Sequence, residues 1–321
     1  MSSVKDVAKL AGVSPSTVSR YIRNACNISA PKREKIKQSI KQLGYVPNFN
    51  ASILKSNRSN LVGLILPSEH NLFFSLLISR LYEALSGKKL IVLYSKNNEE
   101  VKSNIQTLLS LKVSSVLFVP VKYSDSIARI AEKNDCYFLQ LFIDCFPQFD
   151  ALTINDDLGA YLAVKKLLDN GHRRILLLDI NNDVFKQRYK GYTRAFTERG
   201  LAADPLGALT VDGGEDLETA LINRLSEYPA TAVISVTEVL SQQCMQVFNT
   251  RGITVPNDIS LITYDDSMWA KLCGHTAVRQ PLDEVVDGIK GLIDGETERP
   301  KKVVIDPVIV DRNSCADLNG L

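Results

Sequence analysis

The sequence predicts an all-α head followed by an α/β body of two lobes with parallel sheets. Three observations lead to this fold class. Residues 4–43 carry apolar side chains at helical spacing in three short stretches. From residue 61 onward, short apolar runs alternate with helical stretches. With 321 residues, 45% of them hydrophobic, the chain is long enough to form the cores of two or three domains.

The first two helices are predicted within residues 4–21, with a tight turn between them. Gly12 lies where a sharp turn requires a residue that tolerates positive φ. Ser14 and Pro15 suit the N-cap and the first residue of a second helix. Two such helices form a helix-turn-helix, whose second helix offers its first turns to base edges in the DNA major groove. The alternative is an ordinary αα-hairpin on a protein surface. The first helix has an apolar face formed by Val4, Val7, Ala8 and Ala11.

The charge of the chain is unevenly distributed. Residues 1–60 hold eleven Lys and Arg against two acids, which gives +9. The remaining residues hold 27 basic and 34 acidic side chains, which gives −7. A basic head on an acidic body is typical of a nucleic-acid-binding module joined to another domain. The alternative, a basic face that is merely solvated, accounts less well for nine net charges on sixty residues.

A third helix and a connector complete the head. Ser29 is the expected cap of this helix and Gly44 its end. Residues 48–56 could form about two helical turns, which are marginal alone in water, so we expect them to order only when another molecule binds. Leu54 lies in this basic, polar segment and could enter between base steps of the minor groove. A packing contact of Leu54 with the next domain is an equally good explanation.

The body is predicted to contain two parallel sheets. Fully apolar strands that alternate with helices indicate sheets covered on both faces, and about 220 residues of this pattern exceed one open sheet. In such folds ligands bind beyond the carboxyl ends of the strands, and two lobes can close on a ligand by a hinge motion. The predicted strands are residues 61–66, 89–94, 115–119, 137–142, 173–178, 231–236 and 259–264. The predicted helices are residues 73–86, 100–111, 158–170, 186–199, 238–251 and 282–294.

An ordered set of short motifs runs through the head: Val4-Lys-Asp-Val-Ala8, Ala11-Gly-Val-Ser14, Thr17-Val-Ser-Arg20, Leu43-Gly-Tyr45, Pro47-Asn48 and Leu54-Lys55. With these motifs, residues 4–66 resemble the lactose-repressor (LacI–GalR) family of bacterial transcription regulators. The resemblance places Pro15, Ser16 and Arg20 at base-reading positions and Leu54 at the wedge position of a hinge helix. The DNA-binding residues that it implies are Ser14, Pro15, Ser16, Thr17, Ser19, Arg20, Arg23, Asn48, Leu54 and Lys55.

Two residues depart from the pattern of that family. Pro15 brings no hydrogen-bonding side chain, so base readout would depend on Ser16 and Arg20. The guanidinium of Arg20 can contact guanine bidentately. Arg23 stands where the family usually has Asn, and it could add a phosphate contact.

The resemblance continues through the body. Its markers are Asn71-Leu-Phe-Phe74, Gly171-His-Arg-Arg-Ile175, Arg188-Tyr-Lys-Gly-Tyr192, Val255-Pro-Asn-Asp-Ile259, Tyr264-Asp-Asp266, Arg279-Gln-Pro281 and Val310-Asp-Arg-Asn-Ser314. They imply a periplasmic-binding-protein-like effector domain that the chain crosses near 156, 281 and 309. The implied organisation is a head at 1–47, a hinge helix and linker at 48–60, and a body at 61–321. Its N-lobe comprises 61–156 and 282–309, and its C-lobe 157–281 and 310–321.

The resemblance also implies an effector site made by Phe73, Phe74, Arg188, Thr237, Asp265 and Trp269. The aromatic rings could cover a sugar, Arg188 offers a planar donor fork, and Asp265 can accept from hydroxyls. The alternatives are that the two phenylalanines belong to the core and that Arg188 lies on a helix surface. Thr237-Glu238 stands where the family more often has Asn-Asp, which changes the expected ligand hydrogen bonds.

Two stretches indicate a class of effector. Residues 265–281 resemble the branch of the family that senses ketogluconates and related sugar acids, and Tyr21-Ile-Arg23 resembles the gluconate-type branch. Since Arg188 suits a carboxylate but also occurs in sugar- and purine-sensing branches, we expect a sugar or a sugar acid as the effector.

Several classes of protein are disfavoured by what the sequence lacks. It contains no GxGxxG, P-loop, GxSxG or HExxH motif, so we expect no enzyme and no cofactor. Six cysteines without CxxC spacing and three scattered histidines indicate no metal site or disulfide framework. The sequence has no secretory signal and no apolar run near the ~20 residues of a membrane helix. We therefore expect a cytoplasmic protein without a membrane partner.

The sequence thus predicts a transcriptional repressor whose affinity for its operator is controlled by a small molecule. We expect a homodimer on a pseudo-palindromic site in double-stranded DNA, with one head at each half-site. Two alternatives stay open. One is a DNA-binding regulator of the same build controlled by a protein partner, and the other is a sugar-processing α/β enzyme with an accidental basic head.

Overall fold

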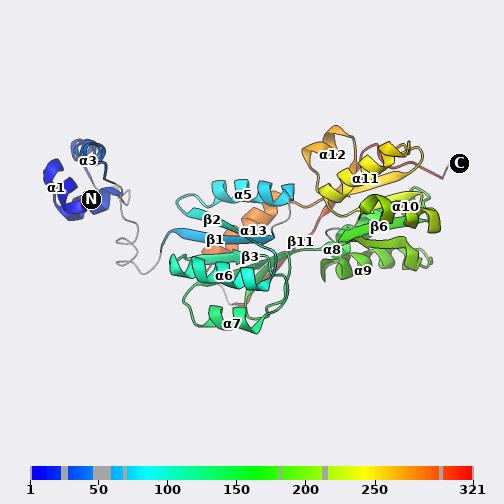
Figure 1. Cartoon of the computed structure of the whole chain (residues 1–321), viewed down its shortest axis with the longest axis horizontal. Coiled ribbons are helices and arrows are strands. Elements are labelled where there is room, and N and C mark those ends of the chain that lie inside the picture. Colours follow the sequence, from blue (N-terminus) through cyan, green and yellow to red (C-terminus); the bar gives the residue numbers. More distant parts are fainter. Residues whose placement is uncertain are drawn as a thin grey trace. The chain divides into compact units, whose positions relative to one another are not determined.

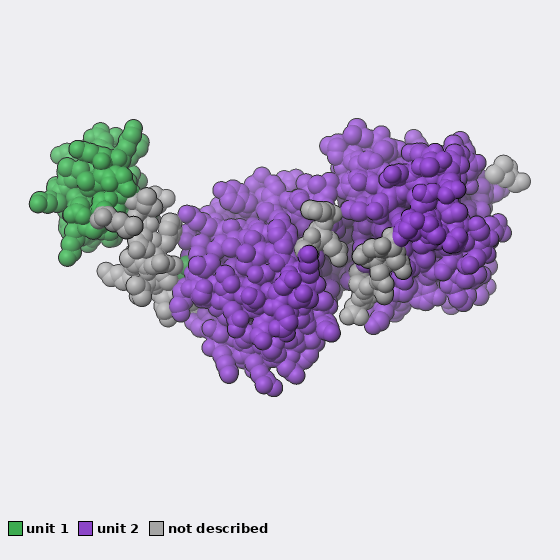
Figure 2. Space-filling view, viewed as in Figure 1, with its two compact units in different colours: residues 1–59 green, residues 60–321 purple. Residues whose placement is uncertain are grey.

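The computed structural model describes residues 2–22, 28–45, 59–67, 71–180, 183–211, 216–295 and 299–319. The chain divides into two compact units, Met1–Ser59 and Asn60–Leu321, coloured green and purple in Figure 2. Within the described ranges, every helix is too short or too polar to cross a membrane.

The first unit is a bundle of three helices: α1 (Val4–Ala11), α2 (Pro15–Ile22) and α3 (Ala30–Leu43). Ser3 and Asp6 form a capping box at the start of α1, and Gly12 ends that helix with φ +63°. Val7, Val18 and Ile36 come from the three helices and are fully buried against one another. The predicted helix-turn-helix is therefore confirmed.

The first lobe of the second unit contains a parallel six-stranded sheet, counted over the described residues, in the order β11-β5-β4-β3-β1-β2. The helices α5 and α13 share one hydrophobic core on this sheet, and α6 and α7 share the other (Figure 1). The strands are β1 (Leu61–Pro67), β2 (Lys89–Ser95), β3 (Ser115–Phe118), β4 (Tyr137–Leu141), β5 (Asp150–Ile154) and β11 (Lys302–Ile305). The helices are α5 (Leu72–Ala84), α6 (Asn98–Ser110), α7 (Asp125–Glu132) and α13 (Leu282–Asp294).

The second lobe is built in the same way, with strand order β12-β10-β9-β8-β6-β7. Its strands pair in parallel except for β12, which is antiparallel to β10. The strands are β6 (Ile175–Ile180), β7 (Ala208–Val211), β8 (Ala232–Ser235), β9 (Ser260–Tyr264), β10 (Thr276–Arg279) and β12 (Val308–Val310). The helices are α8 (Asp156–Asp169), α9 (Asp183–Thr197), the 3-10 turn η1 (Pro205–Gly207), α10 (Leu217–Glu227), α11 (Glu238–Thr250) and α12 (Met268–Leu272). The predicted fold class, two α/β lobes with parallel sheets, is confirmed.

The chain passes between the two lobes three times. The first passage follows β5 at Asn155 and the second follows β10 at Pro281, where the sequence indicated 156 and 281. The third lies at residues 306–307, slightly before the expected position near 309. The difference arises because β12 pairs with the edge strand β10, so residues 308 and 309 lie in the second sheet rather than in the first lobe. Asn155 Nδ2 donates to Asp306 Oδ1 at 2.8 Å and links the first passage to the third.

Candidate functional site

The second helix of the head presents a polar face to solvent. Val18 is buried, whereas Pro15, Ser16 and Arg20 are exposed. The hydroxyl of Ser14 lies 2.7 Å from that of Ser16, and it accepts the backbone N–H of Thr17 at 3.2 Å, which caps α2. Thr17 and Ser19 are half-buried. The packing of α2 therefore leaves exposed the side chains that the resemblance assigned to base reading.

The rest of the predicted DNA contact set cannot be placed. Arg23, Asn48, Leu54 and Lys55 lie outside the described residues, so the hinge helix and its leucine wedge stay predictions. On α3, the side chains of Lys32, Lys35, Lys37 and Lys41 are exposed and add positive charge to the head. Such a surface attracts the phosphate backbone independently of sequence.

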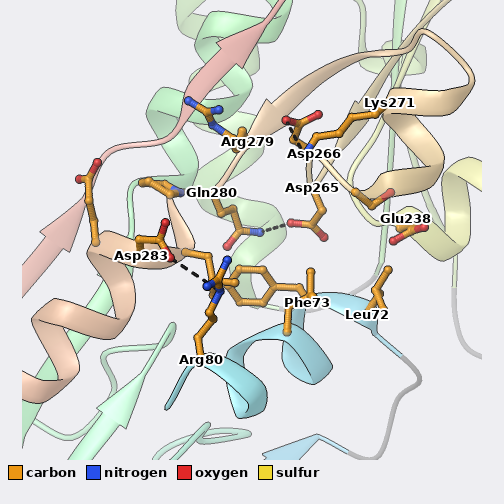
Figure 3. Close-up of a pocket in the computed structure, with 15 residues that line it drawn as sticks. Leu72, Phe73, Arg80, Glu238, Asp265, Asp266, Lys271, Arg279, Gln280 and Asp283 are labelled. Atoms are coloured by element: carbon orange, nitrogen blue, oxygen red, sulfur yellow. Dashed lines mark hydrogen bonds and ion pairs between the residues drawn. The ribbon is translucent and has the colours of Figure 1, made fainter. Parts of the chain in front are cut away.

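Residues of both lobes line one pocket of the body, with a volume of about 400 Å³. From the first lobe, Phe73 on α5 lines the pocket (Figure 3). Glu238 at the start of α11 and Asp265 after β9 come from the second lobe. Gln280, after β10, lies at a passage between the lobes. The ends of parallel strands and the adjoining helix ends thus meet here, as expected for a ligand site in this architecture.

Asp265 is buried and has a left-handed backbone, with 8% of its surface exposed and φ +64°. Gln280 Nε2 donates to its Oδ1 at 2.8 Å. Burial is the main cause that raises the pKa of Asp265 to about 7, and the carboxylate of Glu238 adds to the rise. The nearby charge of Arg188 and the Gln280 hydrogen bond act in the opposite direction. Asp265 can therefore donate or accept a hydrogen bond near neutral pH.

Two residues of this pocket, Glu238 and Gln280, were not among the effector residues predicted from the sequence. Glu238 is 6% exposed; its Oε1 accepts from Gln242 Nε2 at 3.0 Å, and its Oε2 has no partner among the described residues. The signal that could have identified it was the substitution Thr237-Glu238 at the end of a predicted strand. Thr237 itself caps α11, since its hydroxyl accepts the N–H of Leu240 at 3.2 Å, and it does not line the pocket.

Arg188 lies on α9 and is already paired within the protein. Its Nε contacts Asp156 Oδ1 at 2.8 Å, its Nη1 contacts Asp179 Oδ1 at 3.0 Å, and its side chain is 12% exposed. Its guanidinium also lies over the ring of Tyr264, 5.1 Å from the centroid. Burial opposes the charge of Arg188, but the two aspartates outweigh it and raise the pKa of the guanidinium. Burial also raises the pKa of Asp179.

Two further residues that the resemblance assigned to the effector site, Phe74 and Trp269, do not line this pocket. Phe74 packs against Phe73 and Phe142, with ring centroids 5.9 Å apart in both pairs. Trp269 lies on the short helix α12, and its ring meets that of His275 edge-on at a centroid distance of 4.8 Å. The pocket thus brings together Phe73 and Asp265, and it is not lined by Phe74, Arg188, Thr237 or Trp269.

A second pocket of about 410 Å³ is also lined by both lobes. Its three carboxylates already have cationic partners: Asp156 pairs with Arg188, Asp157 with Arg194 and Asp144 with Lys302. Across the described ranges, no group of three or more His, Cys, Asp and Glu side chains is placed to hold a metal ion. Of these two pockets, the first is the one whose described lining includes a buried carboxylate oxygen without a partner, Glu238 Oε2.

Comparison with known proteins identifies the kind of molecule. Residues 3–48 match the bacterial regulatory proteins of the lacI family, and residues 164–315 match a periplasmic binding protein-like domain. The chain is 30% identical over 340 residues to the HTH-type transcriptional repressor PurR of Vibrio atlanticus (strain LGP32), covering 99% of this chain and 100% of that one. It is 29% identical over 337 residues to the HTH-type transcriptional regulator DegA of Bacillus subtilis (strain 168), covering 99% of both.

Solved structures agree with this result. The complex of the transcriptional regulator CelR with cellobiose matches 98% of this chain and 100% of its own, with a TM-score of 0.70 and 25% identity. The lac repressor dimer bound to operator and the anti-inducer ONPF shares the fold, with a TM-score of 0.79 and 23% identity over 98% of this chain and 99% of its own. The relatives are transcriptional regulators, which confirms the prediction that the chain is not an enzyme. The chain therefore belongs to the lacI family of bacterial regulatory proteins, the DNA-binding regulators of transcription.

Proposed function

We propose that the protein is a cytoplasmic repressor that binds a pseudo-palindromic operator as a homodimer, with an affinity set by a small molecule held between the lobes of its body. The observation that carries this proposal is the exposed polar face of α2 on a basic head. The exposed guanidinium of Arg20 has no partner among the described residues, so it is free to contact a base. A bidentate contact with guanine would supply about 1–3 kcal/mol of discrimination.

The hinge segment completes the proposed DNA interface. Leu54 would enter a central base step from the minor groove, beside contacts from Asn48 and Lys55. Ordering this segment costs conformational entropy, which is recovered only when two bodies hold two hinges close together. We expect the bodies to pair through exposed apolar side chains, for which Tyr82 on α5 and Met268 and Leu272 on α12 are candidates, with 71%, 66% and 81% of their surfaces exposed.

The proposed effector is a sugar or a sugar derivative. Phe73 offers an apolar ring, and Asp265 and Gln280 offer polar atoms to hydroxyl groups. Small-molecule sites commonly combine an apolar lining with a few polar groups in this way. The cellobiose complex of CelR supports a carbohydrate, and the resemblance to sugar-acid sensors adds an acidic sugar as a candidate.

Selection of duplexes from a random library tests the proposal. We expect the protein to enrich a two-fold related sequence, and Arg20→Ala to weaken binding to it about 5- to 150-fold. Binding of the same variant to random duplex should change far less. The control Lys37→Ala, on the exposed face of α3, should weaken both kinds of binding by similar factors. Enrichment of no sequence over random competitor would refute the proposal.

A further inference from the structure

Two buried carboxylates in the first pocket have no cation in ion-pair contact with them among the described residues. Glu238 and Asp265 are 6% and 8% exposed, and their hydrogen bonds from side chains come from the neutral amides of Gln242 and Gln280. Glu238 Oε2 is buried and has no partner among the described residues. Figure 3 shows the two side chains as neighbours on one wall of the pocket. A buried carboxylate is costly unless a cation or several hydrogen-bond donors compensate it.

Most of the nearby cations are paired with other acids. Arg188 contacts Asp156 and Asp179, as described above. Lys271 lies 3.7 Å from Asp266, whose other oxygen contacts Arg312 at 2.6 Å. Arg80, at the pocket rim, lies 3.8 Å from Asp283. None of these cations therefore compensates Glu238.

Arg279 is the remaining basic residue of the lining, and its exposed side chain points away from both carboxylates in Figure 3. The described lining carries five carboxylates and three basic side chains, and Arg312, outside the lining, pairs with one of the five, so the formal charge with this partner is −1. An anionic ligand would meet two buried carboxylates here. A neutral ligand would leave both without a cation in contact, because Arg188, whose charge acts on Asp265, is paired with two other aspartates. A ligand with an ammonium group would supply the missing charge and three hydrogen-bond donors.

We propose that the effector of this pocket is an amino sugar whose protonated amine lies between Glu238 and Asp265. Its hydroxyl groups would contact Gln280, and its apolar face would lie on Phe73 and Leu72. The pocket volume of about 400 Å³ is in the range of small-molecule sites and is sufficient for one monosaccharide. This inference rests on the proposed function, since it narrows the ligand of the same pocket.

Matched sets of sugars test the inference on the full-length protein. Each set contains a neutral hexose, its 2-amino derivative and its uronic acid, in the glucose, galactose and mannose series. We expect one of the amines to raise the melting temperature most in its set and the uronic acid to raise it least. Glu238→Gln should weaken the binding of that amine about 10- to 100-fold, the loss expected for a charge-assisted hydrogen bond. The same variant should bind the neutral sugar with nearly the affinity of the parent.

The control variant is Glu284→Gln, which removes an exposed carboxylate from the rim of the same pocket and should keep the preference for the amine. Any of three results would overturn the inference. A neutral or acidic sugar could bind best, Glu238→Gln could lose the same affinity for every sugar of a set, or no amine could stabilise the protein. Operator binding by the same preparation separates the two proposals. If the protein selects an operator but binds no amine, only the amino-sugar proposal is refuted. If it selects no operator, the proposed function is refuted.

Discussion

At the scale of single residues, Asp265 combines two unfavourable features that persist only where the surrounding structure imposes them. Its backbone is in the left-handed region with φ +64°, and its carboxyl group is buried. The N–H of Asp265 donates to Val278 O at 3.0 Å and Gln280 donates to its side chain, so β10 and the residue that follows it fix both. Strain of this kind gathers at ligand sites.

Because Asp265 is buried, we expect its contribution to the free energy of unfolding to depend on pH. Its pKa is raised from 3.8 to about 7 in the folded protein, so between these pH values the folded state retains a proton that the unfolded state loses. The contribution of Asp265 to stability is thus present below pH 3.8 and lost as the pH rises through about 7. Asp265→Asn keeps the shape and tolerates positive φ. We expect its stability relative to the parent to increase by about 1–4 kcal/mol between pH 5 and pH 8.

Urea unfolding at the two pH values checks this prediction, with the fluorescence of Trp269, the one tryptophan of the chain, as the signal from the same lobe. The control is Asp283→Asn, whose side chain is 84% exposed. Its stability relative to the parent should be the same at both pH values. If the free energy of unfolding of Asp265→Asn differed from that of the parent by the same amount at both pH values, Asp265 would not be a buried carboxyl group with a raised pKa.

The sequence identified some residues of the pocket and missed others for a physical reason. The resemblance to the family indicated Asp265, which directly follows the predicted apolar strand at residues 259–264. The pairing of Arg188 with Asp156 and Asp179 depends on contacts 32 and 9 residues apart, which no local pattern reports. In the sequence, Glu238 stands out only as a departure from the Asn-Asp of the family. Its burial depends on how α11 meets the pocket.

At the scale of elements, the strands that the sequence predicted are those with unbroken apolar runs, such as β1 and β9. The missed strands are short, or a charged residue interrupts them. β5 begins at Asp150, which is buried because Tyr137 donates to it at 2.7 Å and Lys301 N–H at 2.8 Å. β11 and β12 are edge strands with half-exposed or exposed side chains. Their partners lie far away in sequence, so only the folded sheet defines them.

The packing of α8 against α9 depends on Gly191. A Cβ at this position would lie 1.9 Å from the carbonyl oxygen of Asp157, which is backbone and cannot move aside. Gly191→Ala must therefore separate the two helices and disturb the Arg188–Asp156 pair at their N-terminal ends. We expect it to lower the free energy of unfolding by at least about 2 kcal/mol, as for overpacking of a core.

Gly291 on α13 provides the matched control. A Cβ there meets nothing within 4 Å, so Gly291→Ala should be neutral or stabilise the helix by up to about 1 kcal/mol. Scanning calorimetry compares the two variants with the parent. Equal melting temperatures for Gly191→Ala and the parent would show that α8 and α9 do not pack as closely as the structure indicates.

At the scale of the whole molecule, a DNA-binding head is joined to a body whose pocket is lined by both lobes. Because residues of both lobes contact one cavity, a ligand there would favour one arrangement of the lobes over another. The passages at Asn155 and residues 306–307 are linked by a hydrogen bond, so they are natural hinge positions for such a change. The proposed ligand control of DNA binding requires that this change be transmitted to residues 48–60, the predicted hinge helix and linker between head and body.

The most direct test is a measurement of operator affinity with and without a saturating concentration of the sugar that gives the largest melting shift. The account predicts a change of about 5- to 150-fold, and it predicts that operator changes the affinity for the sugar by the same factor, because the coupling is reciprocal. An operator affinity that is identical in the presence and absence of the bound sugar would contradict the account.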